Sequence, residues 1–278
     1  MRELDFLIIG AQKAGTTSLR AFLASFDSHI YMSRTEHHFW NRQGQFRDGF
    51  GVSSYMSHFA DARDTQLIGE KSPSYLSSHE APERIAKHFP KVKLIAILRN
   101  PVERAYSAYW HGRRVGAIDA SLTFTQSIER YQDNHGKPYG DLVTPGLYAS
   151  QINRYLDFFP RNQLSILDFD QLLNEPEREL SATVAFLGLD PSRVIKEDLI
   201  QFPKRNTARV SRSPRLSQYL HGTRLLSYDK KSRILKKLFK RGTIPPIRPE
   251  DREFLSALYS DQAREIHALT GVTFDWKF

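Results

Sequence analysis

The sequence of 278 residues contains no cysteine. Disulfide bonds and thiol-based catalysis are therefore excluded, and a cytoplasmic protein is favoured, because disulfides belong mainly to secreted and other oxidising environments. The sequence also lacks an N-terminal basic-then-apolar signal segment. No apolar run approaches the roughly 20 residues that a membrane-spanning helix needs. From these absences, and from the start at Met1, we expect a soluble cytoplasmic protein without a transmembrane segment.

Long flexible tracts are missing as well. The sequence has no Gly/Ser-rich linker, no internal repeat and no low-complexity segment. A chain of this length can form one α/β domain with a sizeable core, or two small domains. Because no linker divides it, we predict one domain over residues 1–278.

The clearest motif is a glycine-containing segment, GAQKAGTTS, at residues 10–18, here called the phosphate loop. An apolar strand pattern precedes it and an amphipathic helix pattern follows it, which is the context that a phosphate-binding loop requires. Such a loop presents backbone N–H groups to a phosphate, and the helix N-terminus adds positive potential. Nucleoside triphosphatases carry lysine directly after the second glycine, but here Thr16 holds that place and Lys13 lies inside the loop. The loop is therefore predicted to bind a 5′-phosphate that carries something other than a polyphosphate chain.

A second nucleotide-binding element is predicted directly after the apolar run at residues 92–98. Such a run is typical of a strand buried on both faces of a parallel sheet. Where an ATPase would typically carry an aspartate that helps to hold magnesium, this strand is followed by Arg99. Arg99, together with Ser107 on a helix that Pro101 can start, favours a second phosphate on the same nucleotide. The alternative is that both side chains only join the helix to the sheet.

Strand and helix patterns alternate along the chain. Strands are expected at 5–9, 67–70, 92–98 and 163–169, and helices at 16–26, 80–89, 101–115, 121–133, 147–158, 176–187 and 250–269. This alternation predicts an α/β protein with a P-loop-like three-layer fold, in which helices flank a central, mainly parallel sheet. Ligands of such sheets bind at the carboxyl ends of the strands. Asp170 is expected to cap the helix that follows the last strand.

The phosphate loop at 10–18, together with KSPSY at 71–75 and LRNPVERAYS at 98–107, resembles the corresponding segments of sulfotransferases that use 3′-phosphoadenosine-5′-phosphosulfate (PAPS). The similarity is greatest to the heparan sulfate glucosaminyl sulfotransferase branch and its bacterial relatives. Further likenesses are TEHHFW at 35–40, GLY at 146–148, DFFP at 157–160 and TFDW at 273–276. The resemblance implies an enzyme that transfers the sulfuryl group of PAPS to a hydroxyl or amine of a glycan or small-metabolite acceptor, releasing 3′-phosphoadenosine-5′-phosphate (PAP). Animal relatives are usually anchored in the Golgi by an N-terminal membrane helix. Because no such helix is predicted here, this chain resembles a soluble bacterial form or an excised catalytic domain.

Sulfuryl transfer needs positive donors near the departing phosphate oxygen and a base for the acceptor's proton. Lys13 and Lys71 are the candidate donors, and the resemblance places Lys71 in the family's K-[ST]-P-x-Y motif. The resemblance also places the catalytic glutamate of the family on Glu36 and its active-site histidine on His38. Aromatic neighbours are expected to raise the pKa of Glu36 by desolvation. The alternative is a surface carboxylate paired with Arg34.

The nucleotide is expected to contact the phosphate loop, the second phosphate element and a later basic segment. The predicted contacts are Lys13, Ala14, Gly15, Thr16, Thr17, Ser18, Arg99, Ser107, Arg209 and Arg212. In animal heparan sulfotransferases a cysteine-bridged loop helps to hold the nucleotide, and in this cysteine-free chain residues 204–215 stand in its place. The alternatives for this segment are a lid over the nucleotide and a solvated basic loop.

No metal site is predicted. His37 and His38 are adjacent in an extended segment and point opposite ways, and no further histidine or cysteine follows at metal-ligand spacing.

The stretch from Lys204 to Arg248 is strongly basic, with Asp229 as its single acid. It is expected to steer the nucleotide, an acidic glycan or an acidic carrier protein. An amphipathic helix near 228–240 on an anionic membrane is another alternative. No nucleic-acid recognition motif accompanies the charge, so no nucleic-acid partner is expected. Two other functions stay open: a sulfotransferase for an acyl-carrier-bound intermediate docked on 228–241, and a phosphate-loop protein that binds nucleotide or polyanion without turnover.

Overall fold

A computed structural model describes most of the chain. It covers residues 2–26, 28–42, 46, 50–115, 117–119, 121–131, 141–194, 209–211, 219, 234, 239–241 and 244–278. The chain forms two compact units, of which the first comprises Met1–Arg99, Tyr148–Arg205 and Gln262–Asp275, and the second Asn100–Leu147, Asn206–Asp261 and Trp276–Phe278. The single domain expected over residues 1–278 stays a prediction.

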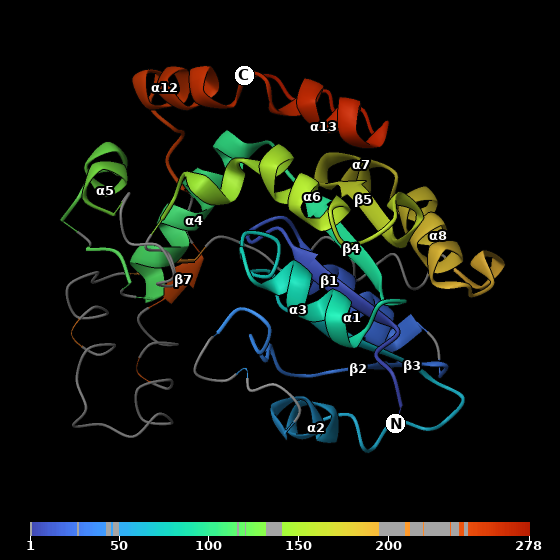
Figure 1. Ribbon diagram of the computed structural model, residues 1–278. Coiled ribbons are helices and arrows are strands. Elements are labelled where there is room, and N and C mark those ends of the chain that lie inside the picture. Colours follow the sequence, from blue (N-terminus) through green and yellow to red (C-terminus); the bar gives the residue numbers. More distant parts are fainter. Residues whose placement is uncertain are drawn as a thin grey trace. The chain divides into compact units, whose positions relative to one another are not determined.

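The first unit is built on a sheet of five strands, all parallel, in the order β2-β3-β1-β4-β5 (Figure 1). The strands are β1 Phe6–Gly10, β2 Ile30–Met32, β3 Leu67–Lys71, β4 Lys93–Leu98 and β5 Leu164–Asp168. Every residue of β1 is buried, as the apolar run in its sequence predicts for a central strand. The chain adds β2 and β3 on one side of β1 and then β4 and β5 on the other. The carboxyl end of β1 is therefore the point where a sheet of this kind binds its ligand.

Helices flank this sheet (Figure 1). They are α1 Thr16–Phe26, α2 Phe50–Ser57, α3 Ala81–His88, α6 Tyr148–Leu156, α7 Phe169–Asn174, α8 Pro176–Leu187 and α13 Gln262–Thr270, with 3₁₀ turns at Arg161–Gln163 and Pro191–Arg193. α1 buries Leu19, Phe22 and Leu23, whose spacing of three and four residues makes one apolar stripe. α13, red in Figure 1, packs against α6, where the Gln262 side chain accepts a hydrogen bond from the backbone N–H of Ala149 (3.0 Å). Within the described part of the chain, no helix is both long and apolar enough to cross a membrane.

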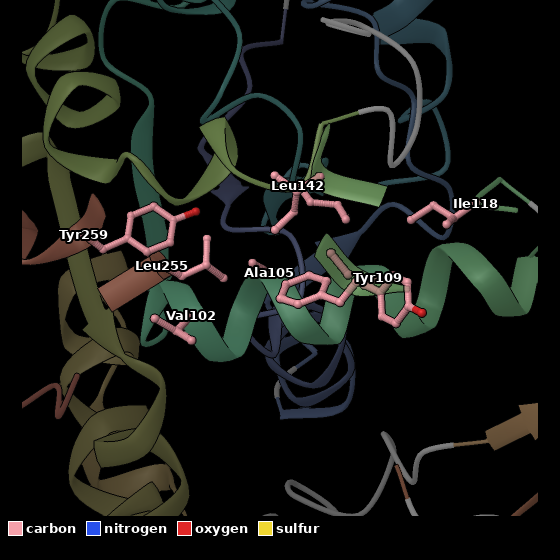
Figure 2. Close-up of a cluster of buried hydrophobic side chains, with 10 residues drawn as sticks. Val102, Ala105, Tyr109, Ile118, Leu142, Leu255 and Tyr259 are labelled. Atoms are coloured by element: carbon pink, nitrogen blue, oxygen red, sulfur yellow. The ribbon is translucent and has the colours of Figure 1, made fainter. Parts of the chain in front are cut away.

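The second unit contains α4 Pro101–Val115, α5 Phe124–Tyr131, the 3₁₀ turn Thr144–Gly146, α12 Pro249–Tyr259, and the antiparallel strands β6 Arg209–Ser211 and β7 Phe239–Arg241. Its core lies along α4, where Val102, Ala105 and Tyr109 repeat every three or four residues (Figure 2). Leu255 and Tyr259 of α12 complete this cluster. The second unit thus buries its own apolar face.

The predicted α/β class, with a parallel sheet flanked by helices, is confirmed. The structure corrects details: β2, α2 and α7 were not expected, and the helix expected over 250–269 is divided into α12 and α13. Asp168 rather than Asp170 caps α7, because its carboxylate accepts the backbone N–H groups of Asp170 and Gln171. Phe239 and Lys240, expected in a helix, belong to β7, while residues 228–233 and 235–238 lie outside the described part.

Candidate functional site

The phosphate loop joins β1 to α1 at the carboxyl edge of the sheet. Lys13 and Gly15 both have left-handed backbone conformations, with φ of 72° and 86°. Glycine adopts this conformation freely, whereas a lysine does so at a cost. The carbonyl of Gly15 accepts the backbone N–H groups of Ser18 and Leu19, so α1 begins directly after the turn. The loop therefore brings a helix N-terminus to the end of a buried strand, which is where an anion is stabilised.

Arg99 lies beside the phosphate loop, directly after β4. Its Nη1 donates to the carbonyl of Lys13 (3.4 Å), and its guanidinium lies 4.9 Å from the centroid of the Phe169 ring. The same ring faces Gly15, where an added Cβ would come within 3.0 Å of it. Phe169, at the start of α7, thus contacts both predicted phosphate-binding elements and was missed in the sequence. Its place after the last apolar strand, at the same sheet edge as the loop, was the signal available.

Lys71 ends β3, the neighbour of β1, and its side chain is only 4% exposed. Its Nζ donates to Thr17 Oγ1 (3.2 Å) and forms a short hydrogen-bonded ion pair with the carboxylate of Glu36. Thr17 belongs to the first turn of α1. A cation at a strand end therefore contacts both the helix that follows the phosphate loop and the predicted base.

The expectation that the pKa of Glu36 is raised is wrong. Burial by itself raises the pKa of this carboxyl, but hydrogen bonds from His38 and Lys71, and the charges of both, outweigh burial and lower the pKa to about 2. The side chain keeps 41% of its surface exposed. Glu36 is therefore a charged carboxylate that is open to solvent and held by a buried lysine.

His38 connects Glu36 to two further polar side chains. Its Nε2 lies 3.4 Å from Glu36 Oε2, and its Nδ1 lies 2.8 Å from Ser74 Oγ. Asn41 Nδ2 donates to the same hydroxyl oxygen (2.9 Å). Ser74 Oγ thus lies between the Asn41 amide and His38 Nδ1, and a Ser74 proton directed at Nδ1 leaves a neutral His38 with its own proton on Nε2, facing Glu36. Ser74 and Asn41 were not among the predicted site residues.

Glu70, directly before Lys71, is fully buried. Its carboxylate accepts hydrogen bonds from the hydroxyls of Tyr55, Ser72 and Tyr75 and from the backbone N–H of His37. Burial raises the pKa of this carboxyl, while the hydrogen bonds oppose that rise. Glu70 was also missed, although an acid inside a strand that is otherwise expected to be buried is itself an unusual feature of the sequence.

His37 packs against two neighbouring polar side chains. Its Nε2 lies 2.9 Å from Ser33 Oγ, and its ring stacks on that of His58, with 4.4 Å between the centroids. Burial, and then the positive charges of His58 and His38, lower the pKa of His37 to about 4.

The structure brings together some of the predicted site residues. Glu36, His38, Lys71 and Thr17 form one connected cluster, while Arg99 contacts the backbone of Lys13. Ala14, Thr16 and Ser18 lie in the loop and the first turn of α1 as expected. Ser107 and Arg209 belong to the second unit, so their roles stay predictions.

Other predictions fall partly or wholly outside the described residues. Arg212 and the side chain of Arg209 lie outside the described part of the chain. Of the basic segment 228–241 the description includes only Ile234 and β7. Across the described residues, the structure contains no cluster of three or more His, Cys, Asp or Glu side chains arranged to hold a metal ion.

Comparison with known proteins identifies the family. The sequence profile of the sulfotransferase domain matches residues 3–264. The bifunctional heparan sulfate N-deacetylase/N-sulfotransferase 4 of Mus musculus is 34% identical over 278 residues, covering 95% of this chain and 29% of that protein. The chain therefore spans less than a third of the length of this curated relative.

Solved structures agree with this assignment. A sulfotransferase from Alicyclobacillus acidocaldarius is 25% identical and aligns with a TM-score of 0.72 over 99% of this chain and 98% of that one. Mouse sulfotransferase SULT7A1, solved with PAP, shares the fold at 16% identity, with a TM-score of 0.55 over 95% of this chain and 85% of that one. Because the profile alone matches far more than half of its length, the chain belongs to the sulfotransferase-domain family and is a transferase of the sulfotransferase type.

Proposed function

We propose that this chain transfers the sulfuryl group of PAPS to a hydroxyl or amine of a glycan acceptor and releases PAP. The observation that carries the proposal is the Glu36–Lys71–Thr17 cluster, in which a carboxylate and a buried cation meet the helix that follows the phosphate loop. The heparan sulfate activity in the name of the mouse relative favours a glycan as the acceptor.

The residues around the phosphate loop suit a phosphosulfate better than a magnesium-bound triphosphate. Thr16 stands where a nucleoside triphosphatase has its lysine, and Arg99 follows the strand where such an enzyme typically has a magnesium-binding aspartate. Lys13, Lys71 and Arg99 supply positive charge at the same edge of the sheet. The donor's two phosphates can therefore be neutralised by side chains and by the N-terminus of α1.

The reaction is an in-line transfer. The acceptor oxygen or nitrogen forms a bond to sulfur, the bond between sulfur and the 5′-phosphate oxygen breaks, and the acceptor's proton passes to Glu36. Negative charge develops on the departing oxygen, where Lys71 and Lys13 stabilise it. Thr17 and His38 hold Lys71 and Glu36 in position through the contacts described above.

The Lys71–Glu36 contact couples the two roles. While Lys71 holds the carboxylate, the pKa of Glu36 is about 2, which makes Glu36 a weak base. When Lys71 turns to the departing phosphate oxygen, Glu36 loses both a hydrogen bond and a nearby positive charge. Its pKa then rises, so the carboxylate becomes a better proton acceptor as the donor is engaged.

Calorimetric titration with PAP without metal, compared with ATP plus Mg²⁺, tests the donor. We expect PAP to bind more tightly, and Arg99→Ala to weaken this binding by about tenfold, since a charged contact contributes on the order of 1.5 kcal/mol. A preference for ATP with Mg²⁺ would contradict the proposal.

The base is tested by transfer from PAPS to a glucosamine-containing oligosaccharide with free amines and hydroxyls. We expect Glu36→Gln to bind PAP normally and to transfer about 100- to 10,000-fold more slowly. Transfer at the wild-type rate by this variant would remove Glu36 from the mechanism.

A further inference from the structure

The segment that carries Glu36, residues 33–41, lies between regular elements and contains neither a helix nor a strand. Within it His38 has a left-handed backbone, with φ of 53°, which a non-glycine residue adopts only when its surroundings hold it there. The position of Glu36 beside Lys71 therefore depends on contacts from outside the segment.

Three consecutive backbone N–H groups of this segment supply those contacts. The N–H of His37 donates to Glu70 Oε1 (3.2 Å), that of His38 to Ser72 Oγ (3.3 Å), and that of Phe39 to the Tyr75 hydroxyl (3.0 Å). All three acceptors belong to the end of β3 and the turn that follows it. The segment is thus fastened to the strand that carries Lys71, immediately next to Glu36.

The four donors that surround the Glu70 carboxylate determine the direction of these hydrogen bonds. Ser72 and Tyr75 each have a single hydroxyl proton, and both protons point to the Glu70 carboxylate. An ionised carboxylate only accepts, so the hydroxyl oxygens are left as acceptors for the N–H groups of His38 and Phe39. Without that charge, both hydroxyls are free to rotate, and the segment loses defined acceptors.

We propose that Glu70 is a positioning residue for the reaction: its buried carboxylate orients Ser72 and Tyr75 so that the 33–41 segment holds Glu36 against Lys71. The proposal rests on the proposed function, because the consequence of misplacing Glu36 is a loss of transfer. A displacement of about 1 Å in a catalytic group can lower the rate about 100-fold.

Two tyrosines offer a matched test. Tyr55 and Tyr75 are both buried, and both donate a hydroxyl proton to Glu70. Only Tyr75 also accepts a backbone N–H of the segment. Tyr55→Phe and Tyr75→Phe therefore remove the same group and one hydrogen bond to the same carboxylate, but only the second releases the segment.

We expect Tyr75→Phe to lower kcat about tenfold and Tyr55→Phe to leave kcat within about twofold of the wild type, with PAP affinity unchanged in both. Glu70→Gln, which introduces an N–H₂ donor among the hydroxyls, is expected to lower kcat about 100-fold while PAP still binds. Equal losses of kcat in the two tyrosine variants, or a wild-type kcat in Glu70→Gln, would overturn the proposal.

Hydrogen exchange of the backbone amides supplies a readout that does not need transfer. The Phe39 amide should exchange faster in Tyr75→Phe and unchanged in Tyr55→Phe, whereas equal exchange in both variants refutes the positioning role. If the wild type binds no PAP and transfers no sulfuryl group, the proposed function fails. The exchange data then still decide whether the Tyr75 hydroxyl, which donates its proton to Glu70, holds the segment.

Discussion

The phosphate loop and the 33–41 segment meet at Lys71, yet they differ in how much of their conformation the neighbouring sequence determines. The loop is shaped by its own neighbours in sequence, a buried strand before it and a helix after it, with Gly15 making the turn. The 33–41 segment is held by side chains that lie more than 30 positions away, from Glu70 to Tyr75. The turn of the phosphate cradle can thus be specified locally, although Arg99 and Phe169 also contact it, whereas the position of the proposed base depends on the assembled sheet.

Lys71→Met breaks both regions at once and has the largest expected effect among the variants that test this contrast. We expect transfer to fall about 100- to 1,000-fold, because the proposed donor to the departing oxygen is lost. The pKa of Glu36 should rise from about 2, since two of its causes are the hydrogen bond and the charge of Lys71. Transfer assays and carboxyl ¹³C titration measure the two effects, and the exposed Lys91 supplies a control in Lys91→Met. A Glu36 midpoint that stays at about 2 would contradict this prediction.

Gly15→Ala breaks the loop alone. A Cβ at Gly15 would lie 3.0 Å from the Phe169 ring, and the alanine would have to adopt a left-handed backbone conformation. Together the two effects should cost roughly 3 kcal/mol of stability. If the loop shifts to relieve that strain, PAP affinity should fall about 100-fold by calorimetry. Gly271→Ala is the control, because Gly271 is also left-handed (φ 74°) but a Cβ there meets nothing within 4 Å. Equal PAP affinities of the two variants would show that the loop tolerates the change.

Ser74→Ala disturbs only the support of His38. Without the Ser74 proton, Nδ1 of a neutral His38 loses a donor, so the share of the tautomer that is protonated on Nδ1 should increase, although Glu36 still faces Nε2. Imidazole ¹⁵N shifts report this directly, and we expect transfer to slow by about tenfold or less. Ser77→Ala is the matched control, because Ser77 Oγ donates to the backbone carbonyl of Ser74. Unchanged imidazole ¹⁵N chemical shifts of His38 in Ser74→Ala would contradict the idea that Ser74 influences the His38 tautomer.

The smallest effect concerns pH and His37. Its pKa falls from 6.5 in the unfolded chain to about 4 in the folded protein, so between these values the unfolded state binds more protons. Stability should therefore decrease as the pH falls from 6.5 to about 4. Because the pKa of Glu36 is also lowered on folding, protonation of Glu36 reduces the stability further, but only below pH 4.5. Urea unfolding at pH 7, 5.5 and 4.5 measures the slope, which should be smaller in His37→Gln; an equal slope in that variant would contradict the assignment.

The same contrast explains what the sequence could predict. The strand, loop and helix over 6–26 were predicted within a residue, because hydrophobic periodicity and glycine placement are local signals. β2 was missed because it has only three residues, and α7 because its cap, Asp168, also ends a strand. The predicted cluster of Glu36, His38 and Lys71 came from motif resemblance, and the structure brings these side chains together.

The electrostatics of Glu36, the proposed base, could not be predicted in the same way. Aromatic neighbours in the sequence suggested a desolvated Glu36 with a raised pKa, but His38, two positions away, and Lys71, 35 positions away, together reverse the shift. Glu70 appeared only as the residue before Lys71, because its partners Tyr55 and His37 come from other parts of the chain. Contacts of this kind have no signature in a single local window.

The strand order has a consequence for how the protein folds. Phe6 pairs with Gly69 on one side and with Lys93 on the other, and Leu94 pairs with Leu164, so all of these pairings join distant parts of the chain. Parallel pairings with such large sequence separations have high contact order and form slowly, because the loop entropy is lost before the contacts are gained. The edge that carries Lys13, Lys71 and Arg99 therefore assembles only after β3 and β4 have both paired with β1. During synthesis β1 therefore precedes both of its partner strands, and its pairing with β4 can form only after residues 93–98 have been made.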